Sequence, residues 1–160
     1  MKAETKKQVL RKMTYGVWVM SAASGSDMEA STVTWVTQMS FVPPLIGVGV
    51  RANSHLHEVV EKSSHFALHL VSEDKKDVAE VFIKPTEVKD GKIAGYPYKL
   101  GLSSGAPILD GFPAYLELQV VEILKRGDHS VVVGEVIDAE LNDAEANPLV
   151  LASTGWHYSG

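Results

Sequence analysis

Apolar and polar residues alternate over several stretches of the chain with the two-residue period of half-buried strands. Within residues 30–41 the run "TVTWVT" alternates in this way, so one side of the predicted strand is rich in hydroxyl groups. After Pro43 and Pro44, the run "LIGVGV" at residues 45–50 is apolar throughout and predicts a fully buried strand. Further strands are predicted at residues 15–22, 66–71, 115–124, 129–139 and 150–158.

Apolar residues spaced three and four apart predict three short helices. The first covers residues 3–13 and would turn its apolar residues toward the core. The second begins at Ser54, a favourable N-cap residue, and ends near Ser63, whereas the third is capped by Asp74. Residues 84–113 contain Pro, Gly and scattered apolar residues and predict a long irregular connection, a kind of segment that often carries function.

About seven strands with tight antiparallel connections and three short helices favour a mainly β (α+β) fold. We expect a β-barrel or sandwich with helical attachments rather than a Rossmann fold, because the strands pair with their neighbours in the sequence. The length of 160 residues fits a single domain over residues 1–160. Neither GxGxxG nor GxxxxGK is present, so neither standard nucleotide-loop motif applies.

The composition of the chain excludes several kinds of function. The net charge is −5 and no basic stripe is visible, which argues against a general nucleic-acid binder. The chain has no cysteine, so disulfides, thiolate nucleophiles and cysteine-ligated metal sites are excluded, and redox chemistry would need a bound cofactor. No apolar run approaches the roughly 20 residues that span a bilayer, and the N-terminus lacks the apolar region of a secretory signal. A cytoplasmic protein without membrane contact is therefore expected.

The run "VGVRANSHLHE" at residues 48–58 predicts an anion site. A buried strand ends in Arg51, and a helix begins at Ser54. The first N–H groups of that helix lack intrahelical partners and carry the positive end of its dipole. With Arg51 as a planar donor and Asn53 beside it, this junction suits a phosphate. An ordinary N-cap next to a surface arginine explains the same residues.

The run "STVTWVTQMS" at residues 31–40 places five hydroxyls and one amide in an otherwise core-like strand. Buried hydroxyls need partners, which a polar heterocyclic ligand lying along the strand would supply. The alternative is a half-exposed strand, because Thr is a good β-former. Trp35 and Gln38 are costly choices for such a plain edge.

His129, in "GDHSVVVGEV", follows a tight turn and could polarise or protonate a substrate or bind a phosphate. The alternative is a turn-flanking histidine capped by Asp128. Gly134 indicates close approach by another backbone or a ligand. No metal site is predicted, because the histidine pairs lack an acidic third ligand, and no GxSxG motif supports a serine hydrolase.

In order and spacing, five segments resemble the flavin reductase-like family, the FMN-binding split β-barrels. The segments are "TYGVWVMSA", "STVTWVTQMSFVPPLIGVGV", "RANSHLHEVVEKSSHFALHLVSE", "GDHSVVVGEV" and "GWHYSG". The pattern around Trp35 and Gln38 looks closer to flavoredoxin and to the reductase domains associated with flavodiiron proteins than to monooxygenase partners.

The resemblance implies a homodimer with one flavin per subunit near the dimer interface, and it implies site residues. The edge of the isoalloxazine and the ribityl chain would contact Thr32, Val33, Thr34, Trp35 and Val36. The phosphate would be held by Ser40, Arg51 and Ser54, with Asn53 as a helper. His129, the expected catalytic residue, would sit near the flavin or the nicotinamide. Many members have Asn in place of Thr34 and Thr in place of Leu56, so the ring-edge and phosphate contacts differ here.

The function implied is an NAD(P)H:flavin (FMN) oxidoreductase with FMN as cofactor, FAD as the alternative, and NADH or NADPH as donor. Electrons would pass to a downstream acceptor such as a redox protein. A second hypothesis is an FMN-bound electron-transfer protein that is reduced by a protein partner. A third is a flavin-binding scaffold without catalysis.

Overall fold

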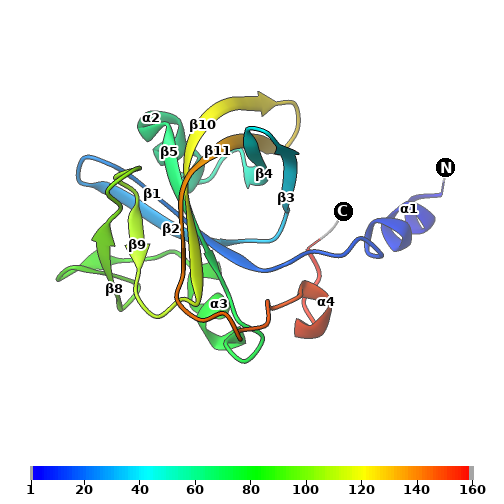
Figure 1. Ribbon diagram of the computed structural model, residues 1–160. Coiled ribbons are helices and arrows are strands. Elements are labelled where there is room, and N and C mark those ends of the chain that lie inside the picture. Colours follow the sequence, from blue (N-terminus) through cyan, green and yellow to red (C-terminus); the bar gives the residue numbers. More distant parts are fainter. Residues whose placement is uncertain (1, 159–160) are drawn as a thin grey trace.

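The computed structural model describes residues 2–158 and is built around a seven-stranded antiparallel sheet (Figure 1). The strand order is β2-β1-β5-β10-β11-β4-β3. The bounds are β1 (Trp18–Ser24), β2 (Asp27–Val33), β3 (Val36–Phe41), β4 (Pro44–Arg51), β5 (His65–Leu70), β10 (Ala114–Lys125) and β11 (His129–Leu141). Every pairing in this sheet is antiparallel, as the sequence predicted.

The two edge strands of this sheet, β2 and β3, are joined by only Thr34 and Trp35. The three residue steps from Val33 to Val36 span at most about 11 Å. The sheet must therefore curl until its edges approach each other, which makes a barrel that stays open between β2 and β3. The single strand predicted over residues 30–41 is wrong, because the chain turns at Thr34 to cross from one edge to the other.

The two larger of three apolar clusters lie on the two sides of the sheet. Inside the barrel, Met20, Phe66 and Leu118 are fully buried together with side chains of β4 and β11. A Cβ on Gly134 would lie 2.7 Å from Cζ of Phe66. The close approach predicted at this glycine is therefore made by a core side chain and not by a ligand or a backbone. The second core includes the buried ring of Phe82.

The helices are α1 (Ala3–Leu10), α2 (His55–Ser63), α3 (Lys76–Ile83) and α4 (Leu151–Thr154). The predicted cap of α2 is confirmed, since the Ser54 hydroxyl accepts a hydrogen bond from the backbone N–H of His57 at 3.2 Å. The predicted cap of α3 is wrong, because Lys75 holds the N-cap position while the Asp74 carboxylate accepts from the Ser72 hydroxyl.

The first helix does not pack on the core. It buries no residue, and Val9 is 63% exposed, so the inward face expected from the sequence is absent in this chain. Figure 1 shows α1 projecting away from the barrel. None of the helices in the described part of the chain is long and apolar enough to cross a membrane.

Residues 84–113 form a second, smaller sheet rather than the irregular connection predicted. Its strands are β6 (Val88–Lys89), β7 (Lys92–Ile93), β8 (Tyr96–Leu100) and β9 (Pro107–Leu109). The chain reverses at Asp90-Gly91 and at Ala94-Gly95, where both residues have positive φ as such hairpin turns require. The strand predicted over residues 150–158 is also wrong: α4 lies there and is capped by Gly155, with φ of 78°, and residues 156–158 follow without regular secondary structure.

Candidate functional site

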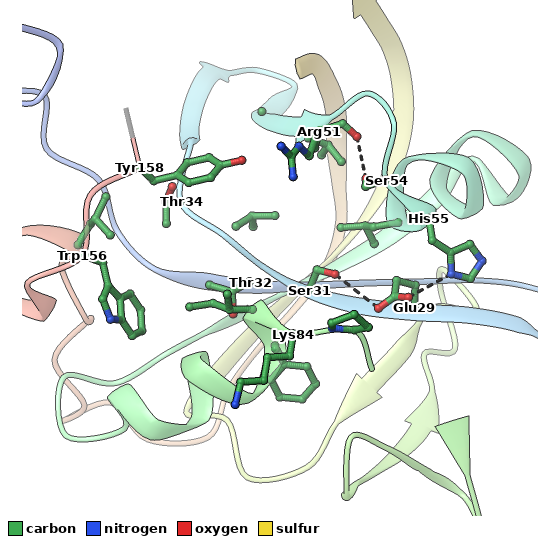
Figure 2. Close-up of a pocket in the computed structure, with 18 of the residues that line it drawn as sticks. Glu29, Ser31, Thr32, Thr34, Arg51, Ser54, His55, Lys84, Trp156 and Tyr158 are labelled. Carbon is green, nitrogen blue, oxygen red and sulfur yellow. Dashed lines mark hydrogen bonds and ion pairs between the residues drawn. The ribbon is translucent and has the colours of Figure 1, made fainter. Parts of the chain in front are cut away.

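A cavity of about 600 Å³ lies where β2, the end of β4, the start of α2, the end of α3 and the C-terminal tail meet (Figure 2). This volume falls within the range of small-molecule sites, roughly 300–1,000 Å³. Five of the residues predicted as ligand contacts line it together, namely Thr32, Val33, Thr34, Arg51 and Ser54. The anion site predicted at residues 48–58 and the ligand-contacting strand predicted at residues 31–40 therefore meet in the same cavity.

One end of the cavity is built to hold an anion. Strand β4 ends at Arg51, and the Ser54 hydroxyl donates to the Arg51 carbonyl oxygen at 2.7 Å while capping α2. The hydroxyl of Ser54 is thereby committed to the turn, so its role is to shape the junction. The donors left for an anion are the Arg51 guanidinium and the N–H groups of α2 that precede His57, since the N–H of His57 is bonded to Ser54. Within residues 2–158 no carboxylate forms an ion pair with Arg51.

The cavity lining includes a buried hydroxyl group that has no hydrogen-bond partner. Thr34 is 8% exposed, and its Oγ1 is the one buried side-chain oxygen or nitrogen without a hydrogen-bond partner among the described residues. The neighbouring hydroxyl of Thr32 instead donates to the Ala79 carbonyl oxygen at 2.8 Å. A buried unpaired hydroxyl is costly, and a polar ligand in the cavity would satisfy it. Thr34 therefore fits a ligand-contacting role better than Thr32.

A carboxylate–histidine cluster lies at the α2 side of the cavity. The ring of His55, on the first turn of α2, contacts Glu29 through Nδ1 at 3.1 Å and Asp27 through Nε2 at 2.7 Å. The pKa of His55 is raised, first by the hydrogen bond to Glu29 and then by Asp27, against an opposing effect of burial. The protonated form of His55 is thus favoured, which places a positive charge beside the anion end of the cavity.

The C-terminal tail closes another side of the cavity through Trp156, His157 and Tyr158. The Trp35 indole N–H donates to the Tyr158 carbonyl oxygen at 3.3 Å, and the two rings lie 5.3 Å apart. These contacts join residues 123 positions apart, so no local pattern could predict them. The last two residues of the "GWHYSG" segment lie outside the described residues.

The other predicted contacts do not line this cavity. Trp35 packs outside it against His129, with ring centroids 4.6 Å apart. Val36 packs against the barrel core, Ser40 sits on the β3–β4 hairpin, and Asn53 is exposed in the turn before α2. Their roles toward a ligand stay predictions.

Residues 10–159 match the flavin reductase like domain family, so the chain belongs to this family. An NADH:FMN oxidoreductase of Rhodococcus qingshengii is 27% identical over 151 residues, which cover 93% of this chain and 77% of the relative. The reductase component of a 4-hydroxyphenylacetate 3-monooxygenase of Thermus thermophilus is 30% identical over 153 residues, covering 96% and 94%. The solved structure of the NADH:FAD oxidoreductase SgcE6 of Streptomyces globisporus C-1027 has a TM-score of 0.79 at 25% identity, covering 94% of this chain and 85% of that one.

The family resemblance drawn from five sequence segments is thereby confirmed, and so is the mainly β fold class. The cavity fits the group that this family implies. Arg51 and the start of α2 suit the phosphate of a flavin nucleotide, and the unpaired Thr34 hydroxyl suits a polar edge.

Proposed function

We propose that this chain is an NAD(P)H-dependent flavin reductase whose cavity binds the flavin nucleotide. The observation that carries the proposal is the combination, on one cavity wall, of the unpaired Thr34 hydroxyl with the anion-binding junction at Arg51. Relatives that are an NADH:FMN and an NADH:FAD oxidoreductase support both the reaction and the two classes of cofactor.

The chain's own residues would bind and orient the flavin, and the redox chemistry between a reduced nicotinamide and the acceptor would be supplied by that cofactor. Arg51 and the α2 N–H groups neutralise the phosphate, and Ser54 fixes the geometry of that junction. Thr34 and the backbone of β2 orient the ring. Catalysis would come from holding the nicotinamide and the flavin close together in the correct orientation, so no side chain has to act as a general base.

We propose FMN as the preferred flavin, with FAD as the alternative. The relative that is an NADH:FMN oxidoreductase supports FMN, whereas the solved NADH:FAD oxidoreductase supports FAD. Fluorescence titration with each flavin measures the preference.

We propose a homodimer, and the exposed β3–β4 hairpin supports it. Phe41 is 85% exposed and Val42 is 91% exposed, an unusual apolar surface for the tip of a hairpin. Ser40 lies on this hairpin and Trp35 just before it, so a dimer would cover the segment that the family resemblance places near the flavin. Sedimentation velocity of the purified protein measures this state.

The downstream acceptor is proposed to be a flavin-dependent partner enzyme. The Thermus thermophilus relative is the reductase component of a monooxygenase, which supports an acceptor of that kind. A cytoplasmic location is proposed as well, since the donor is a reduced pyridine nucleotide.

A steady-state assay tests the proposal. The protein should catalyse oxidation of NADH or NADPH that depends on added flavin, with FMN more effective than FAD. Flavin binding without oxidation of either nucleotide would favour the electron-transfer protein, the alternative that the relatives do not favour. Absence of both binding and oxidation would contradict the assignment.

A further inference from the structure

Three side chains form a hydrogen-bonded row that ends at the cavity. Nδ1 of His129 lies 3.0 Å from Oδ1 of Asp128, and Nε2 of His129 lies 2.6 Å from the hydroxyl of Tyr158. Tyr158 lines the cavity, whereas His129 does not. The row therefore connects His129, the predicted catalytic residue, to the cavity through Tyr158, to which the sequence analysis gave no role.

The direction of the hydrogen bonds in this row follows from Asp128, the residue farthest from the cavity. The pKa of Asp128 is lowered, mainly by its hydrogen bond to His129, so its carboxylate is ionised and can only accept. In the tautomer of His129 that carries its one ring hydrogen on Nδ1, facing Asp128, Nε2 is an acceptor. In that tautomer the Tyr158 O–H donates to Nε2, which leaves the oxygen lone pairs of Tyr158 free to accept from a ligand.

The position of the Tyr158 hydroxyl is fixed by contacts on the side away from the cavity. Trp35 holds the tail through its indole N–H and packs on the rings of both His129 and Tyr158. Figure 2 shows the Tyr158 ring beside Thr34, with its hydroxyl directed toward Arg51. The Tyr158 side chain thus lies between Thr34 and Arg51, the two residues on which the proposed flavin site depends.

We propose that Tyr158 contacts the flavin, its oxygen accepting a hydrogen bond from an N–H or O–H group of that ligand, and that His129 and Asp128 are positioning residues that act through Tyr158. This inference rests on the proposed function. It assigns His129 an indirect role in place of direct contact with flavin or nicotinamide.

A double-mutant cycle tests it, with the FMN dissociation constant measured by fluorescence titration. Tyr158→Phe should raise the constant about 3- to 10-fold, the effect of one lost hydrogen bond. His129→Phe keeps a ring on Trp35 but removes the acceptor, and should have the same effect. The double variant should be no worse than either single variant. His129→Gln, whose amide oxygen can accept from Tyr158, should recover most of the affinity.

Tyr15→Phe is the matched control, because Tyr15 also packs near Trp35 while its hydroxyl contacts Met13. It should bind FMN like the wild type. Wild-type affinity in Tyr158→Phe, or additive effects of the two phenylalanine variants, would overturn the inference while leaving the proposed function intact. An unchanged FMN constant with a raised KM for NADH would move the contact to the nicotinamide and overturn it too. A wild type that binds no flavin overturns both proposals.

Discussion

The backbone N–H of Gly49 donates a hydrogen bond to the carbonyl oxygen of Trp35 at 2.8 Å, and the indole packs directly on the glycine. A Cβ at position 49 would lie 2.8 Å from Cε3 and 3.0 Å from Cβ of Trp35. Real side chains essentially never approach so closely, so only glycine fits here. This contact fixes the two-residue link between the sheet edges against the strand that ends in Arg51.

Gly49→Ala should displace Trp35 and, with it, the tail that carries Tyr158. We expect a loss of about 1–3 kcal/mol in the free energy of unfolding, as for other overpacked sites, together with weaker FMN binding. Gly47→Ala on the same strand is the control, because its new Cβ would crowd the flexible, exposed side chain of Met39 and would otherwise make an ordinary contact with Val131. Urea unfolding of the two variants measures the difference, and equal stabilities would show that Trp35 is free to move.

Arg51→Ala should weaken FMN binding roughly 10- to 100-fold, the usual effect of removing a charge-assisted hydrogen bond. The loss should shrink as salt rises, because screening weakens the same attraction in the wild type. Arg11→Ala, an exposed arginine beside α1, is the control. A fluorescence titration at two salt concentrations measures both effects. Unchanged affinity would move the phosphate away from the β4–α2 junction.

Thr34→Val should change stability and binding in opposite directions. Removing the unpaired hydroxyl should raise the free energy of unfolding of the ligand-free protein by about 1 kcal/mol, because a buried group without a partner is lost. The same change should raise the FMN dissociation constant about 3- to 10-fold. Thr37→Val, at an exposed position of β3, should change neither quantity by a comparable amount. Calorimetric titration and urea unfolding give the two numbers, and a variant that binds FMN normally would remove Thr34 from the site.

The sequence predicted the elements whose determinants are local. Ser54 as the cap of α2 and the hairpin of β10 and β11 each depend on a few neighbouring residues, and they form as predicted. A buried strand ending in a cation, and hydroxyls in a core-like strand, each suggested a ligand beside an ordinary structural alternative, and the family resemblance then placed Arg51 and Thr34 in the site. Both line the cavity.

The features that local pattern could not give depend on distant contacts. Trp35 and Val36 continue the alternation of the strand before them, and only the hydrogen bond from Gly49 shows that the chain has already turned. The tail reads as a strand but is held by Trp35 and His129, far away in the sequence. The Asp90-Gly91 pair is a typical hairpin-turn sequence, so this turn could have been predicted locally. It was missed because residues 84–113 were judged by their Pro and Gly content.

His69 makes the stability of the protein depend on pH. It is fully buried, its Nδ1–H donates to the Val19 carbonyl oxygen, and its Nε2 accepts from the Leu109 N–H, both at 3.0 Å. Burial lowers the pKa of His69 from 6.5 to about 4. The neutral ring therefore stabilises the fold fully above pH 6.5, and this contribution is lost as the pH falls from 6.5 toward 4 because the unfolded chain binds the proton first.

The loss over this range should be about 3 kcal/mol, from a pKa difference of roughly two and a half units. Urea unfolding at several pH values should show this slope in the wild type and in His65→Gln. The slope should be smaller in His69→Gln, even though that variant is less stable overall. Equal slopes in all three proteins would assign the acid sensitivity to other groups.

The proposed function requires that the cavity between Thr34 and Arg51 hold a flavin that a reduced pyridine nucleotide reduces. The most direct measurement is the visible absorption spectrum of the protein with one equivalent of FMN, under anaerobic conditions, before and after addition of NADH or NADPH. We predict that the flavin band disappears within seconds with the wild type and much more slowly with Arg51→Ala at the same flavin concentration. A band that persists with both nucleotides, or that fades equally fast in the two proteins, would contradict the claim.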